Sequence, residues 1–262
     1  MFLLIIILIE IPLKKMKKLF FTFLLIITQN IFPQSDSNTT ILIVHGAWGG
    51  GWSFKKVDEI LTKKGAKVYR PTLSGLGEKV HLLSENINLK THINDIVNVV
   101  LYEELTEIIL VGHSYGGMVI TGVADSIPQR IKKMVYLDAI VPLNNESVSS
   151  IFEFTPTEND IKIGGIVPAW VDINKSPPKD VPHPIKTMTD QINLSNKEKN
   201  KISSVYILTV EKNKKPEEDD FASQAEKAKS KGWDVIYFES DHNPQWSAPK
   251  KISNLIMTLS DN

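Results

Sequence analysis

The clearest catalytic signal is a serine inside the run GHSYGG at residues 112–117, which directly follows the apolar stretch IILV. A serine between two glycines, preceded by a strand and followed by a helix, fits the strained strand-to-helix turn that presents a nucleophile. The small neighbours leave room for that turn, and the turn exposes the hydroxyl at the carboxyl end of a sheet. We therefore predict that Ser114 is a nucleophile.

A serine hydroxyl is a weak nucleophile at neutral pH and needs a base, usually histidine, to accept its proton. Only His183 and His242 follow Ser114 in the chain. His183 lies in a proline-rich stretch that no predicted strand fixes, whereas His242 follows the predicted strand at 234–238 and precedes the last predicted helix. His242 is therefore the expected general base.

The acid that would orient His242 has two candidate positions. Asp138 closes the apolar stretch MVYLD at 134–138, and Glu211 is the first carboxylate after VYILTV at 205–210. A carboxylate that ends an apolar strand is costly to bury without a partner such as imidazole. We therefore favour Asp138 as the acid and keep Glu211 as the alternative.

A tetrahedral intermediate at the serine needs two backbone N–H groups that are aimed at its oxyanion. Tyr115, the residue after the nucleophile, supplies the first. The second comes from the loop HGAWGGGW at 45–52, which follows the stretch ILIV and whose glycines let the backbone approach a substrate. Ala47 is the expected second donor, and His45 in the same loop is expected to be structural.

The elements that must position these residues alternate regularly from Thr40 onward. Short β-branched runs predict strands at 41–44, 66–70, 108–111, 134–138, 205–210 and 234–238. Helices are predicted at 52–64, 91–105, 115–126, 219–231 and 248–259. Strands separated by helices pair in parallel, so we predict an α/β fold with a doubly wound, mostly parallel sheet and helices on both faces.

The interval 143–204 breaks this alternation and is rich in Pro, Asn and Lys. A loop of this length is uncommon in a compact domain unless it is functional. We therefore predict an inserted lid over the carboxyl edge of the sheet, where open α/β sheets bind their ligands. Four side chains from the lid and the nearby loops are candidates for substrate contact, although core packing is an equal alternative for each: Trp48, Leu76, His81 and Trp170.

The composition limits the function classes. The chain has 262 residues, of which 42% are hydrophobic and 23% charged, and we assign 35–262 to one catalytic domain. Basic and acidic residues number 30 each, so the charge gives no reason to expect a nucleic acid or an anionic membrane as partner. Cysteine is absent, which excludes disulfides, thiolate metal sites and a cysteine nucleophile. A neutral small molecule is the expected partner, and the oligomeric state stays open.

Residues 1–34 differ in character from the rest of the chain. Lysines at 14, 15, 17 and 18 precede the apolar run 19–27, and from Met16 onward this is the pattern of a secretory signal peptide. We therefore expect an exported protein, periplasmic or secreted, with no stable membrane partner after cleavage. The alternative is an uncleaved membrane anchor, although the run is short for a span of about 20 residues.

With these segments in place, the sequence resembles α/β-hydrolase esterases related to plant methyl-salicylate esterases and hydroxynitrile lyases, and especially their bacterial relatives. The resemblance rests on VHGAWGGGW, RPTLSGLGEKVHLLS, LVGHSYGGMVITGVAD, MVYLDAIVP and DHNPQWSAP, and it covers most of 41–258 outside the lid. It implies the α/β-hydrolase fold, catalysis without a cofactor or metal, and a small apolar pocket beneath the lid. The same motifs match Ser114 and His242 to the nucleophile and base of that family.

The sequence departs from the pattern of these relatives at three positions. In the lyases, a threonine lies beside the first oxyanion donor and a lysine directly follows the catalytic histidine, but here these positions hold Gly46 and Asn243. The aspartate usual after the strand at 205–210 is also missing. Haloalkane dehalogenases place the acid at the other strand end, and Asp138 occupies the analogous position here.

The leading hypothesis is hydrolysis of a small carboxylic ester through an acyl-enzyme at Ser114, with His242 as base and then acid. One alternative is a hydroxynitrile-lyase-like enzyme that cleaves a carbon–carbon bond, which Gly46 and Asn243 argue against. The other alternative is a small-molecule binding protein of the same fold that turns over its ligand slowly or not at all.

Overall fold

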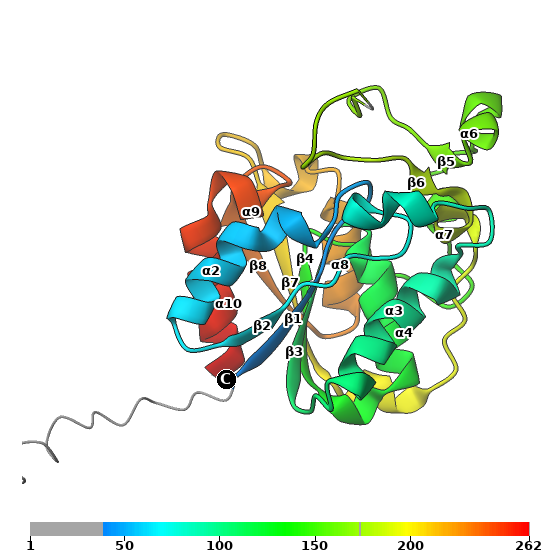
Figure 1. Ribbon diagram of the computed structural model, residues 1–262. Coiled ribbons are helices and arrows are strands. Elements are labelled where there is room, and N and C mark those ends of the chain that lie inside the picture. The colour runs from blue at the N-terminus through cyan, green and yellow to red at the C-terminus, as the bar shows by residue number, and fades with distance from the viewer. Residues whose placement is uncertain (1–38, 173, 262) are drawn as a thin grey trace, which may run out of the picture. The chain divides into compact units, whose positions relative to one another are not determined.

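The central feature of the structure is a parallel sheet of six strands in the order β2-β1-β3-β4-β7-β8 (Figure 1). The computed structural model describes residues 39–172 and 174–261. The strands of this sheet are β1 (Thr40–Val44), β2 (Lys67–Tyr69), β3 (Ile108–His113), β4 (Ile131–Leu137), β7 (Ser203–Val210) and β8 (Asp234–Glu239).

Helices connect the strands and cover both faces of the sheet. The α-helices are α2 (Lys55–Lys63), α3 (Leu89–Tyr102), α4 (Gly116–Ser126), α5 (Val148–Ile151), α6 (Glu158–Ile163), α7 (Ile185–Thr189), α8 (Ala222–Ser230), α9 (Pro244–Ser247) and α10 (Pro249–Asp261). The short 3₁₀ helices are η1 (Gly51–Phe54), η2 (Gly77–Leu82), η3 (Pro128–Arg130), η4 (Lys197–Lys201) and η5 (Pro216–Glu218).

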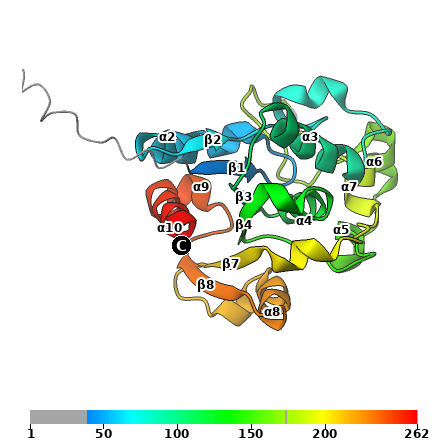
Figure 2. The same cartoon turned by 90° about the horizontal axis from the view of Figure 1, so that it is seen from below.

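Two apolar cores lie on opposite faces of the sheet, and successive strand residues alternate between them. In β1, Leu42 and Val44 pack in the core with α3, α4 and α8, whereas Ile41 and Ile43 pack in the core with α2 and α10. Figure 2 shows these two groups of helices on either side of the strands. Because both faces are buried, the central strands are apolar at nearly every position, which is typical of parallel sheets.

The predicted doubly wound sheet with helices on both faces is confirmed, and all six predicted strands are present. The largest difference concerns the strand predicted at 134–138, which begins at Ile131 and ends at Leu137. Asp138 has a φ of 45°, in the left-handed region that an extended strand does not use. The strand therefore ends one residue before the carboxylate that the sequence assigned to it.

The segment 143–204, predicted as a lid, joins β4 to β7 and contains several short elements instead of one long loop. Helices α5, α6 and α7 lie in it, together with the antiparallel pair β5 (Gly165–Ile166) and β6 (His183–Pro184). Figure 1 shows α6, β5 and β6 beyond the edge of the sheet at which β1 and β3 end. The frequent prolines keep these elements short, because proline ends helices and cannot donate in a strand.

The predicted leader, residues 1–34, lies outside the described residues, and both the export and the anchor hypotheses therefore stay predictions. Among residues 39–172 and 174–261, no helix combines the length and the apolar character that a membrane crossing needs.

The close packing of α4 against the turn after β4 generates a stability prediction. A Cβ atom added to Gly117 would lie 2.1 Å from the backbone oxygen of Ile140. Alanine favours a helix over glycine by about 1 kcal/mol, but relieving a backbone clash of this size costs more. We expect Gly117→Ala to lower the free energy of unfolding by at least about 1 kcal/mol, measured by urea denaturation.

The matched control is Asn98→Ala at an exposed position of α3. This change should alter the free energy of unfolding by less than about 0.5 kcal/mol. A Gly117→Ala protein as stable as the native one would contradict the proposed packing.

Candidate active site

Ser114 lies in a sharp turn between β3 and α4, with a φ of 54°. Its backbone N–H donates to the oxygen of Leu137 over 3.2 Å, and its own oxygen accepts from the nitrogen of Ile140 over 3.1 Å. A Cβ atom on Gly116 would lie 2.5 Å from the oxygen of Val44, so only glycine fits there. The strained conformation is therefore held by hydrogen bonds with the end of β4 and the turn after it, and by close contact with β1.

The structure brings Ser114, His242 and Asp138 into one chain of hydrogen bonds. Nδ1 of His242 lies 2.6 Å from Oδ2 of Asp138, and Nε2 lies 3.0 Å from Oγ of Ser114. An ionised carboxylate only accepts hydrogen bonds, so Nδ1 carries the imidazole proton. Nε2 is left with a lone pair that faces the serine hydroxyl, which is the arrangement a general base requires.

Asp138 is buried, with only 1% of its surface exposed. Its second oxygen, Oδ1, accepts from the backbone nitrogen of Thr209 over 3.0 Å, so both carboxylate oxygens have partners. Its own backbone N–H donates to the oxygen of Ile207 over 2.7 Å. These bonds to β7 fix the direction of the carboxylate and offset the cost of its burial.

The alternative acid, Glu211, lies away from this chain of hydrogen bonds. It follows β7, its side chain is 54% exposed, and its Oε1 lies 3.0 Å from Nζ of Lys214. The structure therefore places Asp138, and not Glu211, beside His242. The physical reason is that the left-handed conformation of Asp138 turns its carboxylate toward the loop after β8, whereas Glu211 extends into solvent.

Two contacts that the sequence analysis missed hold His242 in place. Nε2 of His113 donates to the backbone oxygen of His242 over 2.8 Å, and the ring of Phe221 stacks on the imidazole with centroids 4.8 Å apart. Burial lowers the pKa of His113 to about 3, so this imidazole stays neutral. In the sequence, only the position of His113 directly before Ser114 indicated that it could lie at the site. No motif indicated this for Phe221.

The turn after β1 runs directly beside the serine. A Cβ atom on Gly46 would lie 3.1 Å from Cβ of Ser114, so the absence of a side chain permits this approach. Ala47 and Tyr115, the two predicted oxyanion donors, both line the cavity into which Ser114 opens. Among the hydrogen bonds of residues 39–172 and 174–261, no acceptor pairs with the backbone N–H of Ala47 or Tyr115. Both groups are thus available to an incoming oxygen.

Trp48, the next residue in that turn, is bound by the 143–204 segment. Its backbone N–H donates to Nδ1 of His183 over 3.1 Å, and its indole N–H donates to the oxygen of Ile166 over 3.0 Å. The backbone N–H of Val181 donates to its oxygen over 2.9 Å. The expectation that no strand fixes His183 is therefore wrong, because this residue lies in β6, is fully buried and contacts the predicted oxyanion loop.

Two further buried histidines hold the neighbouring loops. Nε2 of His92 donates to the oxygen of Ser74 over 2.8 Å, and Nδ1 of His92 accepts from the Tyr115 hydroxyl over 2.9 Å. Nδ1 of His45 donates to the oxygen of Gly46, and its Nε2 accepts from a backbone N–H. Burial lowers the pKa of His45 and of His92 to about 4, which keeps both rings neutral. The structural role expected for His45 agrees with these contacts.

Ser114 opens into an apolar cavity of about 380 Å³. Trp48 and Trp170, two of the predicted substrate contacts, line it, and their rings meet edge to face with centroids 5.3 Å apart. Most of the remaining wall is apolar and comes from the 143–204 segment and neighbouring loops: Ile140, Val148, Phe152, Phe154, Ile166, Pro168, Met188 and Phe221. A smaller cavity of about 240 Å³ that also borders Ser114 has a more polar wall that includes Asp180 and Asn243.

The structure does not place Leu76 or His81 at either cavity beside the serine. Leu76 is fully buried in the core with α3 and α4, and His81 is exposed on η2. Both residues follow β2 in the chain, but the side chain of Leu76 turns into the core and that of His81 turns toward solvent. Within the described ranges, no group of three or more His, Cys, Asp or Glu side chains is arranged as a metal site.

Comparison with known proteins gives three kinds of match. A family model described as "Alpha/beta hydrolase family" matches residues 41–255. A carbendazim-hydrolysing esterase from Nocardioides sp. is 47% identical over 133 residues, covering 50% of this chain and 55% of the relative. Salicylic acid-binding protein 2 from Nicotiana tabacum is 30% identical over 154 residues, covering 56% of this chain and 55% of the relative. The aligned region thus spans little more than half the length of these two relatives.

Solved structures share the fold. An extracellular alpha/beta-hydrolase from a Paenibacillus species superimposes with a TM-score of 0.68 at 22% identity, over 85% of this chain and 98% of that chain. A methylesterase from Arabidopsis superimposes with a TM-score of 0.65 at 22% identity, over 85% and 99%.

The buried neutral histidines generate a prediction about pH and stability. Unfolded imidazoles have a pKa near 6.5, whereas burial lowers the pKa of His92 to about 4, so the unfolded chain binds more protons between these values. Stability is therefore fully present above about pH 6.5 and falls as the pH drops toward 4. We expect each such imidazole to remove roughly 2 kcal/mol from the free energy of unfolding at about pH 5.

Urea denaturation at neutral pH and at about pH 5 measures this loss. His92→Gln should lose less stability between the two pH values than the native protein, whatever its stability at neutral pH. His81→Gln, the same change at an exposed position, should keep the native difference. An identical pH dependence in His92→Gln and the native protein would contradict the inference.

Proposed function

The chain belongs to the alpha/beta hydrolase family, and from this premise we propose that it hydrolyses a small carboxylic ester through an acyl-enzyme at Ser114. The observation that carries the proposal is the hydrogen-bond chain from the buried Asp138 through His242 to Ser114, with the serine open to an apolar cavity. The names of the matching relatives, an esterase from Nocardioides among them, support the same reaction class.

In the proposed acylation step, Oγ of Ser114 attacks the ester carbonyl carbon while Nε2 of His242 accepts the hydroxyl proton. The resulting imidazolium is stabilised by the carboxylate of Asp138, 2.6 Å from Nδ1. The backbone N–H groups of Ala47 and Tyr115 donate to the oxyanion as it forms. Collapse of the intermediate breaks the bond to the alcohol, which leaves with the proton from Nε2.

Deacylation reverses these roles with water in place of the serine. Nε2 of His242 removes a proton from water, whose oxygen attacks the acyl carbon, and the second tetrahedral intermediate uses the same two N–H donors. The proton then returns to Oγ of Ser114 and the carboxylic acid leaves. His113 holds the backbone of His242 and Phe221 holds the face of its ring. These contacts keep the imidazole within reach of Oγ of Ser114 and of the attacking water.

We propose that the segment 143–204 is the lid of this enzyme and selects the substrate. It supplies much of the wall of the apolar cavity and binds Trp48 through His183 and Ile166. A cavity of about 380 Å³ with an apolar wall suits the hydrocarbon part of a small uncharged ester. Movement of this segment would change the cavity and the oxyanion loop together.

A lyase is a weaker candidate, because Gly46 and Asn243 bring neither a hydroxyl nor an ammonium group beside Ser114. A binding protein without turnover remains the contrasting hypothesis. It predicts a reactive serine and bound ligand but no sustained release of alcohol, so steady-state hydrolysis of an ester distinguishes it from an esterase.

The first test of the proposal removes the serine and the acid separately. Ser114→Ala should abolish both covalent labelling by a fluorophosphonate, detected by intact mass, and turnover of p-nitrophenyl acetate. Asp138→Asn should retain the fold but lower kcat by about 10,000-fold, because the imidazole loses the partner that fixes its tautomer and stabilises its charge.

Glu211→Gln is the matched control for the acid, since it makes the same chemical change at the exposed alternative position, and it should leave turnover unchanged. Labelling that persists in Ser114→Ala would contradict the assignment of Ser114 as the nucleophile, and the esterase proposal with it. If Asp138→Asn were active and Glu211→Gln inactive, Glu211 and not Asp138 would be the catalytic acid.

The second test concerns the apolar cavity. Lengthening the acyl group of a p-nitrophenyl ester from acetate to butyrate should raise kcat/KM by about fourfold for each added methylene. The reason is that burying one methylene in an apolar cavity contributes about 0.8 kcal/mol of binding free energy. Val148→Phe narrows the cavity and should reduce this gain. A kcat/KM that stays flat or falls with acyl length in the native protein would contradict the assigned cavity.

A further inference from the structure

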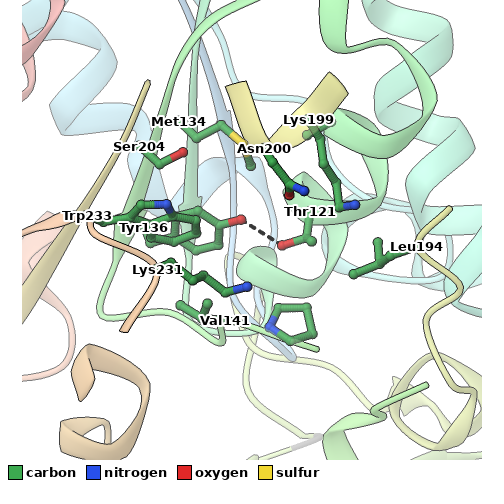
Figure 3. A pocket seen from close by; sticks show the side chains of 12 residues that line it. Thr121, Met134, Tyr136, Val141, Leu194, Lys199, Asn200, Ser204, Lys231 and Trp233 are labelled. Atoms are coloured by element: carbon green, nitrogen blue, oxygen red, sulfur yellow. Dashed lines mark hydrogen bonds between the residues drawn. The ribbon is translucent and has the colours of Figure 1, made fainter. Parts of the chain in front are cut away.

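A third cavity, of about 290 Å³, lies between α4, β4 and the segment that leads into β7 (Figure 3). Its buried floor contains Met134, Tyr136 and Val141, and its rim carries the polar side chains of Lys199, Asn200 and Lys231. None of the residues that line it lines either cavity beside Ser114. The reaction proposed above therefore does not use this cavity.

The two lysines of the rim differ in their partners. Nζ of Lys199 lies 3.3 Å from Oδ1 of Asp125 and also donates to the backbone oxygen of Asn196. Lys231 lies near the ring of Trp233, and among the described residues no carboxylate forms an ion pair with it. Partial burial and the nearby charges of Lys199 and Lys227 lower the pKa of Lys231. The carboxylate of Glu146, which pairs with Lys227, offsets part of this charge without bonding to Lys231. The rim therefore keeps an excess of positive charge.

The floor of the cavity is aromatic, and the hydroxyl groups of Thr121 and Tyr136 both donate their protons within the protein. The Thr121 hydroxyl donates to the oxygen of Gly117 over 2.7 Å, so the Tyr136 hydroxyl must donate to Thr121 across their 2.7 Å contact, which Figure 3 shows. The rings of Tyr136 and Trp233 stack with centroids 4.9 Å apart. The floor thus accepts an apolar, flat body, while hydrogen-bond donors are concentrated at the rim.

We propose that this cavity is a second ligand site that binds a small apolar monocarboxylate, with its hydrocarbon or aromatic body against Tyr136 and Trp233 and its carboxylate on Lys231. A bound carboxylate gives the ammonium of Lys231 the direct ion pair that it lacks among the described residues, and Lys199 and Asn200 offer further donors to the same group. Figure 3 shows Lys199 and Lys231 lining the cavity from different elements of the chain.

The site is a separate one, although it shares two elements with the proposed active site. Ile140 lines the apolar cavity at Ser114, whereas the next residue, Val141, lines the third cavity. Thr121 lies on α4, the helix that begins two residues after Ser114. Because the two cavities share no lining residue, both can be occupied at the same time.

The test uses benzoate as the probe and the indole N–H resonance of Trp233, assigned by its loss in Trp233→Phe. Millimolar benzoate should shift this resonance in a saturable manner, while binding beside Ser114 would instead shift those of Trp48 and Trp170. Benzamide, which has nearly the same shape without the charge, should bind about tenfold more weakly, since it loses the charge-assisted contact.

Lys231→Gln should likewise weaken benzoate binding about tenfold, and Lys231→Arg should retain it. Lys63→Gln, which removes the same charge from an exposed position on α2, should leave the dissociation constant unchanged. A Trp233 resonance that benzoate does not shift would overturn the site. Equal affinities for benzoate and benzamide, or for the native protein and Lys231→Gln, would overturn the carboxylate as its ligand. Neither result would bear on the esterase proposal, which depends on Ser114.

Discussion

The burial of the Asp138 carboxylate is the condition on which the rest of the site depends. A charge with 1% exposure is tolerated only if both of its oxygens have hydrogen-bond partners, and these come from Thr209 at the end of β7 and from His242 after β8. Three adjacent parallel strands must therefore end at the same level. The same requirement turns the imidazole so that its free nitrogen faces Ser114, 3.0 Å away.

Around this charged pair the protein arranges neutral imidazoles instead of further charges. His45, His92 and His113 each contact a backbone oxygen, and burial keeps their pKa values at about 4 or below. Such groups fix the loops after β1, β2 and β8 without adding a positive charge that would repel a protonated His242. In a site of low dielectric, an additional fixed cation would weaken His242 as a base.

The segment 143–204 both lines the apolar cavity and holds the loop after β1 in place. Through His183, Ile166 and Val181 it holds Trp48, the residue next to the proposed oxyanion donor Ala47. A tight turn with a φ of 61° at Trp48 needs such support, because an isolated turn would relax to a less strained conformation. The wall that would recognise the substrate and the loop that would stabilise the intermediate are thus one packed unit.

The sequence by itself determined the doubly wound sheet and the positions of Ser114 and His242, because strand patterns and the glycine-rich turn are local properties of the chain. It also favoured Asp138 over Glu211, since a carboxylate at the end of an apolar strand requires a partner. Only the tertiary structure decided which loop side chains line the cavities. It turned Leu76 into the core and His81 to solvent, and it brought His113, His183 and Phe221 to the site, since such contacts between distant segments depend on packing that no local pattern encodes.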